Sequence, residues 1–272
     1  MNYLMAILAG TIQGLTEFLP VSSSAHLLFF HRFFSFDFVS NLAFDVALHW
    51  GTFLALLIYF FKDVKDLIIS FFKSIRTLDF ISSQSRLPWL IIIGTIPAVI
   101  AGLLFDDLIE NFFHQGDTGL VLVCVALIIV SVIFILAEKL AKNNLRLAEM
   151  SWGTALLCGL AQACALIPGV SRSGGTISAG LLLGLNRVEA ARFSFLLSMP
   201  IVFGAATKQL IKISFVGAID WPLFVLGIFV SLIVGYIVIA GLLKYLERHS
   251  LNIFAYYRLS LAVLVLLWLW WR

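Results

Sequence analysis

The chain has 272 residues, of which 61% are hydrophobic and 12% are charged, whereas soluble domains average about 45–50% apolar and about 25% charged residues. This composition excludes a soluble enzyme and predicts that residues 1–272 form a single all-α, polytopic membrane domain surrounded by membrane lipids. The formal net charge of +3 comes from Lys and Arg in predicted loops, so it reflects topology and anionic lipid headgroups, and no basic tract indicates a nucleic-acid partner.

In chain order, residues 3–33 come first, as two apolar segments interrupted by Pro20 and a serine cluster. We interpret them as a re-entrant helical hairpin, because non-helical backbone at membrane depth is tolerated only when it is buried in protein or lines a wet cavity. An ordinary spanning helix over 3–19 is the alternative, since its length nearly suffices. Residues 152–185, interrupted by Pro168 and Gly169, are interpreted as a second re-entrant hairpin.

A bilayer core of about 30 Å requires about 20 apolar helical residues. Six stretches meet this requirement and are predicted to be transmembrane helices: 43–62, 88–106, 118–138, 190–210, 222–244 and 254–271. After the first of them, a segment with one apolar face and one charged face predicts a helix that lies on the membrane surface. The small-residue spacing from Gly235 to Gly241 is compatible with a homodimer.

The loop charges predict the orientation. Five basic residues follow the first span, namely Lys62, Lys65, Lys73, Arg76 and Arg86, whereas the next connection carries only acidic residues. The former loop is therefore predicted to be cytoplasmic and both termini external, although Lys208 and Lys212 fall on the external side. The halves 1–138 and 139–272 are then inverted, so that their hairpins enter from opposite sides and meet near the midplane.

The first interruption carries groups that can act on a phosphate. Glu17 follows Gln13 by four residues, so both side chains share one helical face, and a carboxylate there can hold a divalent cation or accept a proton. Helix caps and free backbone N–H groups that attract anions are predicted where the next helix begins. Three serines occupy that place: Ser22, Ser23 and Ser24. His26 follows Ser23 by three residues, close enough to exchange a proton with its hydroxyl.

The second interruption resembles an anion site in its residue types. Arg172 offers a planar, bidentate clamp for a phosphate, and the small residues around it let the backbone approach an anion closely. These neighbours are Ser171, Ser173, Gly174 and Thr176. One carboxylate, one imidazole and one guanidinium among hydroxyl groups suit phosphoryl transfer, in which positioning and charge neutralisation provide most of the catalysis.

Simpler interpretations are also open. Each serine, considered alone, is more often a helix cap than a catalytic group. A purely structural ion pair between Glu17 and Arg172 is the alternative for the charged residues, but the cost of ionisable groups inside a membrane favours a functional role. Asp45, His49 and Arg258 lie near predicted span ends, where they can reach the interface or support the site.

Several motifs along the chain resemble those of the undecaprenyl-diphosphate phosphatases of the bacitracin-resistance type, which are integral membrane enzymes of bacterial cell-wall lipid recycling. The similarity covers nearly the whole chain and rests on Glu-Phe-Leu-Pro-Val-Ser-Ser at 17–23, Phe-Asp at 44–45 with Gly-Thr at 51–52, Ile-Pro-Ala at 96–98, Pro-Gly-Val-Ser-Arg-Ser-Gly-Gly-Thr at 168–176, Phe-Ser-Phe-Leu-Leu at 193–197 and Phe-Ala-Tyr-Tyr-Arg at 254–258.

The resemblance implies hydrolysis of undecaprenyl diphosphate to the monophosphate and inorganic phosphate, assisted by a divalent cation such as Mg²⁺ or Ca²⁺. It also implies a place in the bacterial cytoplasmic membrane, with the active site open to the external side. It places the catalytic carboxylate at Glu17, the nucleophile at Ser23, the acid–base imidazole at His26 and the phosphate clamp at Arg172. Attack by water in place of Ser23 is equally compatible with these residues.

Two positions depart from the family pattern. Gln13 stands where a second glutamate is usual, so a metal site formed by Glu17 and Gln13 is predicted to bind a cation more weakly. Ala25 stands where glycine usually precedes the histidine, which should stiffen that turn.

Two other functions are compatible with parts of the pattern. Inverted repeats with broken helices are also typical of transporters, so a flippase of a polyprenyl phosphate lipid is the alternative. A membrane scaffold with buried polar contacts is the third interpretation.

Overall fold

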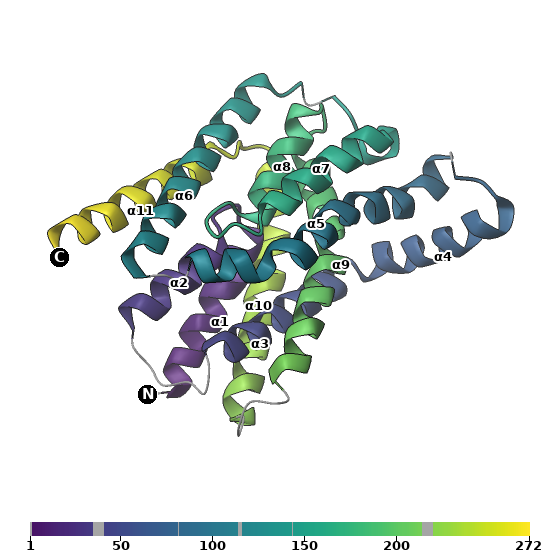
Figure 1. The fold of residues 1–272 in the computed structure, drawn as a ribbon. Helices are drawn as coiled ribbons and strands as arrows, with labels where there is room; N and C mark the ends of the chain where they lie inside the picture. Colours follow the sequence, from purple (N-terminus) through teal and green to yellow (C-terminus); the bar gives the residue numbers. More distant parts are fainter. Residues whose placement is uncertain (1, 35–40, 81, 114–115, 143, 214–219) are drawn as a thin grey trace.

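The computed structural model describes residues 2–34, 41–80, 82–113, 116–142, 144–213 and 220–272, and within these ranges the chain is helical and has no β-strand (Figure 1). The helices are α1 (Asn2–Phe18), α2 (Ser23–Phe33), α3 (Asn41–Tyr59), α4 (Phe61–Thr77), α5 (Ser83–Phe113), α6 (Gly116–Leu140), the short 3-10 helix η1 (Leu147–Glu149), α7 (Trp152–Cys164), α8 (Arg172–Leu182), α9 (Arg187–Ile213), α10 (Trp221–Leu246) and α11 (Asn252–Trp271).

Helices α5, α6, α9, α10 and α11 each contain a segment long and apolar enough to cross a membrane, and a sixth such segment results if α3 and α4 are counted together. This confirms an all-α membrane protein. The predicted span 43–62 ends three residues late, because α3 ends at Tyr59 and the chain bends by 76° into α4, which is the amphipathic helix predicted to follow it. The cause is visible in the sequence: Lys62, Asp63 and Lys65 make α4 amphipathic and unsuited to continue a span.

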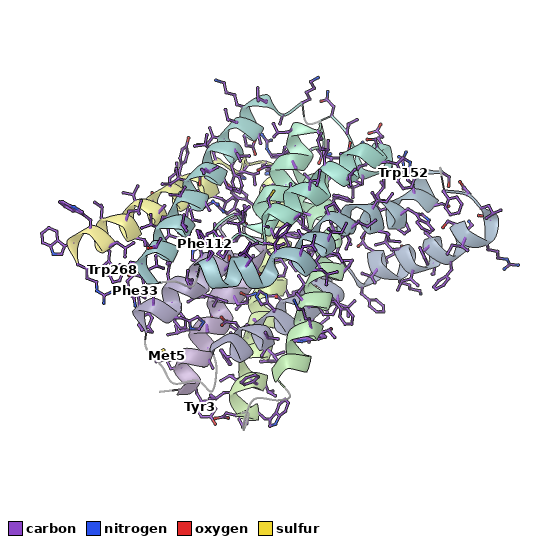
Figure 2. All side chains as sticks on the ribbon, viewed as in Figure 1. Tyr3, Met5, Phe33, Phe112, Trp152 and Trp268 are labelled. Atoms are coloured by element: carbon purple, nitrogen blue, oxygen red, sulfur yellow. The ribbon has the colours of Figure 1, made fainter. Side chains whose placement is uncertain are left out.

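The outer surface of the bundle is apolar. Large side chains such as Tyr3 and Phe112 project from it (Figure 2), and each of these two is 57% exposed. Exposed hydrocarbon of this extent is expected where lipid rather than water is the solvent. An arm formed by α4 and the first part of α5 projects from the bundle (Figure 1). Re-entry of 3–33 and 152–185, and the inversion of the two halves, remain predictions.

The two interruptions of the helical chain share one local geometry. Helix α1 ends before Pro20 and α2 begins after Ser22, whose φ is +78° and whose Oγ accepts a hydrogen bond from the N–H of Ala25. Helix α7 ends before Pro168 and α8 begins after Ser171, whose φ is +69° and whose Oγ accepts from the N–H of Gly174. A left-handed conformation is uncommon for serine, so its recurrence supports a common structural role for the two motifs.

Arg258 of α11 forms hydrogen bonds with both interruptions of the helical chain. Its side chain is fully buried (0% exposed), and its guanidinium donates to the carbonyl oxygens of Pro20 (3.4 Å) and Gly169 (2.7 Å) and to the hydroxyl of Ser131 on α6 (3.3 Å). It also lies over the ring of Phe134, 5.1 Å from the centroid. Carbonyl groups at a helix break have no intrahelical partner, and Arg258 supplies donors to both breaks at once.

Glycines allow the central helices to approach each other closely. Helix α10 packs against both α1 and α3, and a Cβ on Gly51 of α3 would lie 2.4 Å from the carbonyl oxygen of Ile228. At the contact between α5 and α7, a Cβ on Gly159 would lie 2.1 Å from the carbonyl oxygen of Gly94. Gly235, considered above for a homodimer, packs inside the chain against Phe18. Close backbone contacts of this kind hold helices together in lipid, where the hydrophobic effect does not drive helices to associate.

Gly159→Ala should destabilise the protein, because the added methyl group would force α5 and α7 apart; overpacking typically costs about 1–3 kcal/mol. We expect a lower midpoint of thermal unfolding in detergent. Gly102→Ala is the control, because Gly102 lies in α5, the partner helix of α7, but a Cβ there meets nothing within 4 Å. An unchanged midpoint for Gly159→Ala would contradict the packing described here.

Arg258→Met should also lower the unfolding midpoint, because it leaves the carbonyl groups of Pro20 and Gly169 without donors, at a cost of about 1–3 kcal/mol for each unpaired group. Arg258→Lys should restore little, since one ammonium group cannot reproduce a planar fork of five N–H donors. The control is Arg248→Met, which changes an exposed arginine shortly before α11. Equal midpoints for the Arg258 and Arg248 variants would show that Arg258 does not hold the two breaks.

Candidate active site

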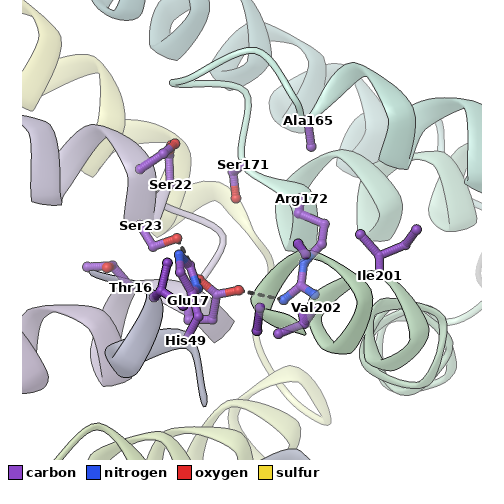
Figure 3. A pocket seen from close by; sticks show the side chains of 14 residues that line it. Thr16, Glu17, Ser22, Ser23, His49, Ala165, Ser171, Arg172, Ile201 and Val202 are labelled. Atoms are coloured by element: carbon purple, nitrogen blue, oxygen red, sulfur yellow. Dashed lines mark hydrogen bonds and ion pairs between the residues drawn. The ribbon is translucent and has the colours of Figure 1, made fainter. Parts of the chain in front are cut away.

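The two interruptions meet inside the bundle, as the sequence predicts. Arg172 Nη2, at the start of α8, donates to Glu17 Oε1, near the end of α1, over 2.8 Å (Figure 3). Ser173 Oγ donates to the carbonyl oxygen of Leu19 over 3.3 Å. Residues more than 150 positions apart in the chain are thus joined by an ion pair and by a hydrogen bond between the two motifs.

Glu17 is the centre of this polar cluster, although its residue is only 8% exposed. One carboxylate oxygen, Oε1, accepts from Arg172, and the other, Oε2, accepts from Ser23 Oγ (2.6 Å) and Gln13 Nε2 (3.0 Å). Charge-assisted hydrogen bonds of this length are among the stronger ones in proteins. The Ser23 hydroxyl therefore already directs its proton to a carboxylate, which is the arrangement that activates a nucleophile.

A cavity of about 240 Å³ opens beside these groups. One wall is polar and is formed by Thr16, Glu17, Ser22, Ser23, Ser24, His49, Ser171 and Arg172. The rest of the lining is apolar and comes mostly from α9: Ile201, Val202, Ala205 and Ala206, with Val46 and Ala165. A cavity with one polar and one apolar wall suits a molecule that combines a charged headgroup with a hydrocarbon chain.

Three of the residues predicted to bind phosphate do not reach this cavity. Ser173 and Thr176 are each 1% exposed, and the Thr176 hydroxyl contacts Ser194 and donates to the carbonyl of Arg172. At Gly174 a Cβ would lie 2.1 Å from the ring of Phe134, so this glycine serves close packing of α8 against α6. Residues that follow a cap by two to five positions turn into the helix and away from its tip, which the motif alone does not show.

His26 occupies a different place from the one predicted. Its Nδ1 lies 2.7 Å from the carbonyl oxygen of Ser22, its Nε2 lies 2.7 Å from the hydroxyl of Tyr257, and its ring is stacked on that of Tyr257. Both ring nitrogens are therefore engaged away from Ser23. The spacing of three residues puts His26 and Ser23 on neighbouring faces of α2, but the Ser23 side chain is directed to Glu17 and the imidazole is not.

The imidazole that lines the cavity is His49 of α3. Its Nδ1 lies 2.8 Å from Gln13 Nε2 and 3.7 Å from Glu17 Oε2. The sequence indicated His49 only as a residue that could support the site. The signal that could have raised it further is a histidine inside a stretch predicted to span the membrane, where titratable side chains are usually functional.

The donor set beside Glu17 is limited for a metal ion. No group of three His, Cys, Asp or Glu side chains is arranged to hold a metal within the described residues. Gln13 Oε1, however, is buried and has no hydrogen-bond partner, and it belongs to the side chain that contacts Glu17. One carboxylate and one free amide oxygen fit a hard cation such as Mg²⁺, which usually takes one or two carboxylates and completes its shell with water and substrate phosphates.

Comparison with known proteins gives a consistent result. A family model described as bacitracin resistance protein BacA matches residues 6–264. Three relatives, each named undecaprenyl-diphosphatase, illustrate the similarity. The protein of Thermomicrobium roseum is 43% identical over 98% of both chains, and that of Thermodesulfovibrio yellowstonii is 45% identical over 96% of this chain and 95% of the relative. The protein of Idiomarina loihiensis is 42% identical over 98% of this chain and 99% of the relative.

Proposed function

The chain belongs to the family of the bacitracin resistance protein BacA, and from this membership and from its site we infer that it is an undecaprenyl-diphosphatase. It is an integral membrane hydrolase that converts undecaprenyl diphosphate into undecaprenyl phosphate and inorganic phosphate. Recycling of the cell-wall lipid carrier and resistance to bacitracin fit this family. No observation in the described part of the chain favours a flippase.

One observation carries the assignment of the site. Glu17 holds the hydroxyl of Ser23 on one oxygen and the guanidinium of Arg172 on the other, in a cavity whose lining also includes hydrocarbon side chains of α9. The nucleophile Ser23, its proton acceptor Glu17 and the phosphate-binding guanidinium of Arg172 thus lie together where the headgroup of a lipid can reach them. A scaffold protein has no need of this combination.

Binding of the diphosphate depends on positive charge and on N–H donors. Arg172 has further N–H groups besides those donated to Glu17 and, over 3.4 Å, to the carbonyl oxygen of Ser198, and these bind a phosphate placed in the cavity. The N-termini of α2 and α8 converge on the same place, and their free backbone N–H groups and dipoles favour an anion. The cavity-lining hydroxyls of Ser22, Ser24 and Ser171 complete the polar wall.

The hydrolysis then proceeds in two steps. Ser23 Oγ attacks the terminal phosphorus while its proton passes to Glu17 Oε2, and the bond between that phosphorus and the bridging oxygen breaks, so that undecaprenyl phosphate leaves. Water then attacks the phosphorus of the phosphoserine, the bond between phosphorus and Ser23 Oγ breaks, and Glu17 returns its proton to Oγ, so that inorganic phosphate is released and the hydroxyl and the carboxylate are restored. The alternative is direct attack by water, with Glu17 or His49 as the base. His26 acts on neither route as the base; it fixes the turn by its contact with the Ser22 carbonyl.

A divalent cation, Mg²⁺ or Ca²⁺, belongs to this proposal, with Glu17 and Gln13 Oε1 as its protein ligands. Such a cation would neutralise part of the charge of the diphosphate. The proposal also places the protein in the bacterial cytoplasmic membrane, with the cavity open to the external side, as the loop charges indicate.

Ser23→Ala should lower phosphate release from undecaprenyl diphosphate in detergent by about a thousandfold or more, since loss of a nucleophile removes a group that the others act through. Ser24→Ala is the matched control, because the neighbouring hydroxyl lines the same cavity and should cost much less. Rapid quenching with labelled substrate should trap phosphoserine at Ser23. If Ser23→Ala keeps more than about a tenth of the wild-type rate and no adduct forms, water is the nucleophile.

Arg172→Lys should lower the rate by about 10²–10³-fold, the range for loss of one well-placed donor to a transition state. The lysine keeps the charge but loses the fork that serves Glu17 and phosphate together. Arg192→Lys is the control, because Arg192 is paired with Asp63 away from the cavity. Equal rates for wild type and Arg172→Lys would contradict the role assigned to Arg172.

Gln13→Glu should strengthen the cation dependence, because the affinity of such sites rises with the number of charged ligands. We expect the Mg²⁺ concentration that gives half-maximal phosphate release to fall by about tenfold. Gln162→Glu is the control, because Gln162 is also buried but has no hydrogen bond to Glu17. If neither variant changes the Mg²⁺ dependence, Gln13 is not a ligand.

A further inference from the structure

Two apolar hollows lie on the outside of α5, beyond the apolar wall of the active-site cavity. The first, of about 280 Å³, is formed by Ile92, Thr95, Ile96, Val99 and Ile100 of α5 together with Pro200 of α9. The second, of about 260 Å³, lies between α5 and α4 and is lined by Pro88, Ile91 and Ile92 with Leu67 and Phe71. Both hollows are lined almost entirely by hydrocarbon. In the first, the hydroxyl of Thr95 is engaged, because it donates to the carbonyl of Ile91 over 2.7 Å.

The active-site cavity and the two hollows follow one another in space. Ile201 belongs to the wall of the cavity, and Pro200, the preceding residue of α9, belongs to the first hollow. Ile92 lines both the first and the second hollow. The cavity and the first hollow thus meet α9 at neighbouring residues, and the two hollows follow one another along α5 toward the arm that Figure 1 shows projecting from the bundle.

The sequence explains why the helices leave a hollow at this level. Pro97 stands inside α5 next to Ile96, and Pro200 stands inside α9 on the facing side. A proline in a helix interior removes one backbone hydrogen bond and favours a bend. Pro200 of α9 lines the hollow, and Ile96, beside Pro97, is left 48% exposed.

We propose that the polyprenyl tail of the substrate leaves the active-site cavity past Ile201 and Pro200 and lies in the hollow between α5 and α9, with its far end directed to the hollow beside α4. This inference rests on the proposed function and adds a binding site for the tail. The cavity of about 240 Å³ can enclose a headgroup but not a long polyprenyl chain, and its apolar wall is on the α9 side. The tail contacts the hollow between α5 and α9, and van der Waals contacts between its hydrocarbon and that hollow favour long substrates.

The test compares a long and a short substrate. Ile96→Trp would fill the first hollow, so kcat/KM for undecaprenyl diphosphate should fall by about tenfold or more, which corresponds to about 1.4 kcal/mol of lost binding. The value for farnesyl diphosphate, whose tail is too short to depend on the hollow, should change by no more than about twofold. Ile92→Trp, at the residue shared by both hollows, provides a second variant and should show the same selectivity.

Ile129→Trp is the matched control, because Ile129 is an exposed isoleucine (54%) on α6 and lines neither hollow. It should leave both substrates unaffected. The inference is overturned if Ile96→Trp and Ile92→Trp lower activity on both substrates equally, or on neither, while the wild type is active. A wild-type protein that releases phosphate from neither substrate would instead refute the proposed function itself, so the two failures are distinguishable.

Discussion

The ion pair between Glu17 and Arg172 is the interaction on which the site depends. Each group alone inside a membrane would cost several kcal/mol, and together they fix the meeting point of two helix breaks that are far apart in the sequence. Because the second carboxylate oxygen of Glu17 accepts a hydrogen bond from Ser23, the same ion pair also positions the nucleophile. A single arrangement of three side chains thus neutralises charge, joins the helices and activates a hydroxyl.

Much of this arrangement could be predicted from the sequence, because hydrocarbon makes polar residues conspicuous. Glu17 and Arg172 lie beside proline-interrupted apolar segments. Charged residues in such segments are explained by an ion pair between them or by a bound ligand. The helix bounds followed from apolar length, and the structure confirms them within a few residues for the spans after the first. The serine caps were predictable from helix chemistry, although their left-handed backbone was not.

The failures have a common physical cause. Spacing along a helix determines a face, but not which of several partners a side chain selects, so His26 was assigned to Ser23 while the structure gives it to Ser22 and Tyr257. The partner Tyr257 is more than 200 residues away, and His49 reaches Glu17 from another helix. Thr176 and Gly174 were assigned to phosphate because composition cannot distinguish a residue at a helix tip from one packed a turn inside it. The separate helix α4 follows from its amphipathic pattern, although the end of the first span is predicted three residues late because apolar residues continue across the bend.

The position of Arg258 in the last helix has a consequence for biosynthesis. The carbonyl groups of Pro20 and Gly169 have no donor from Arg258 until α11 has been translated. In a nascent chain, the helices that carry the two motifs are therefore synthesised well before the residue that holds the motifs in register. A chain truncated before α11 lacks this contact.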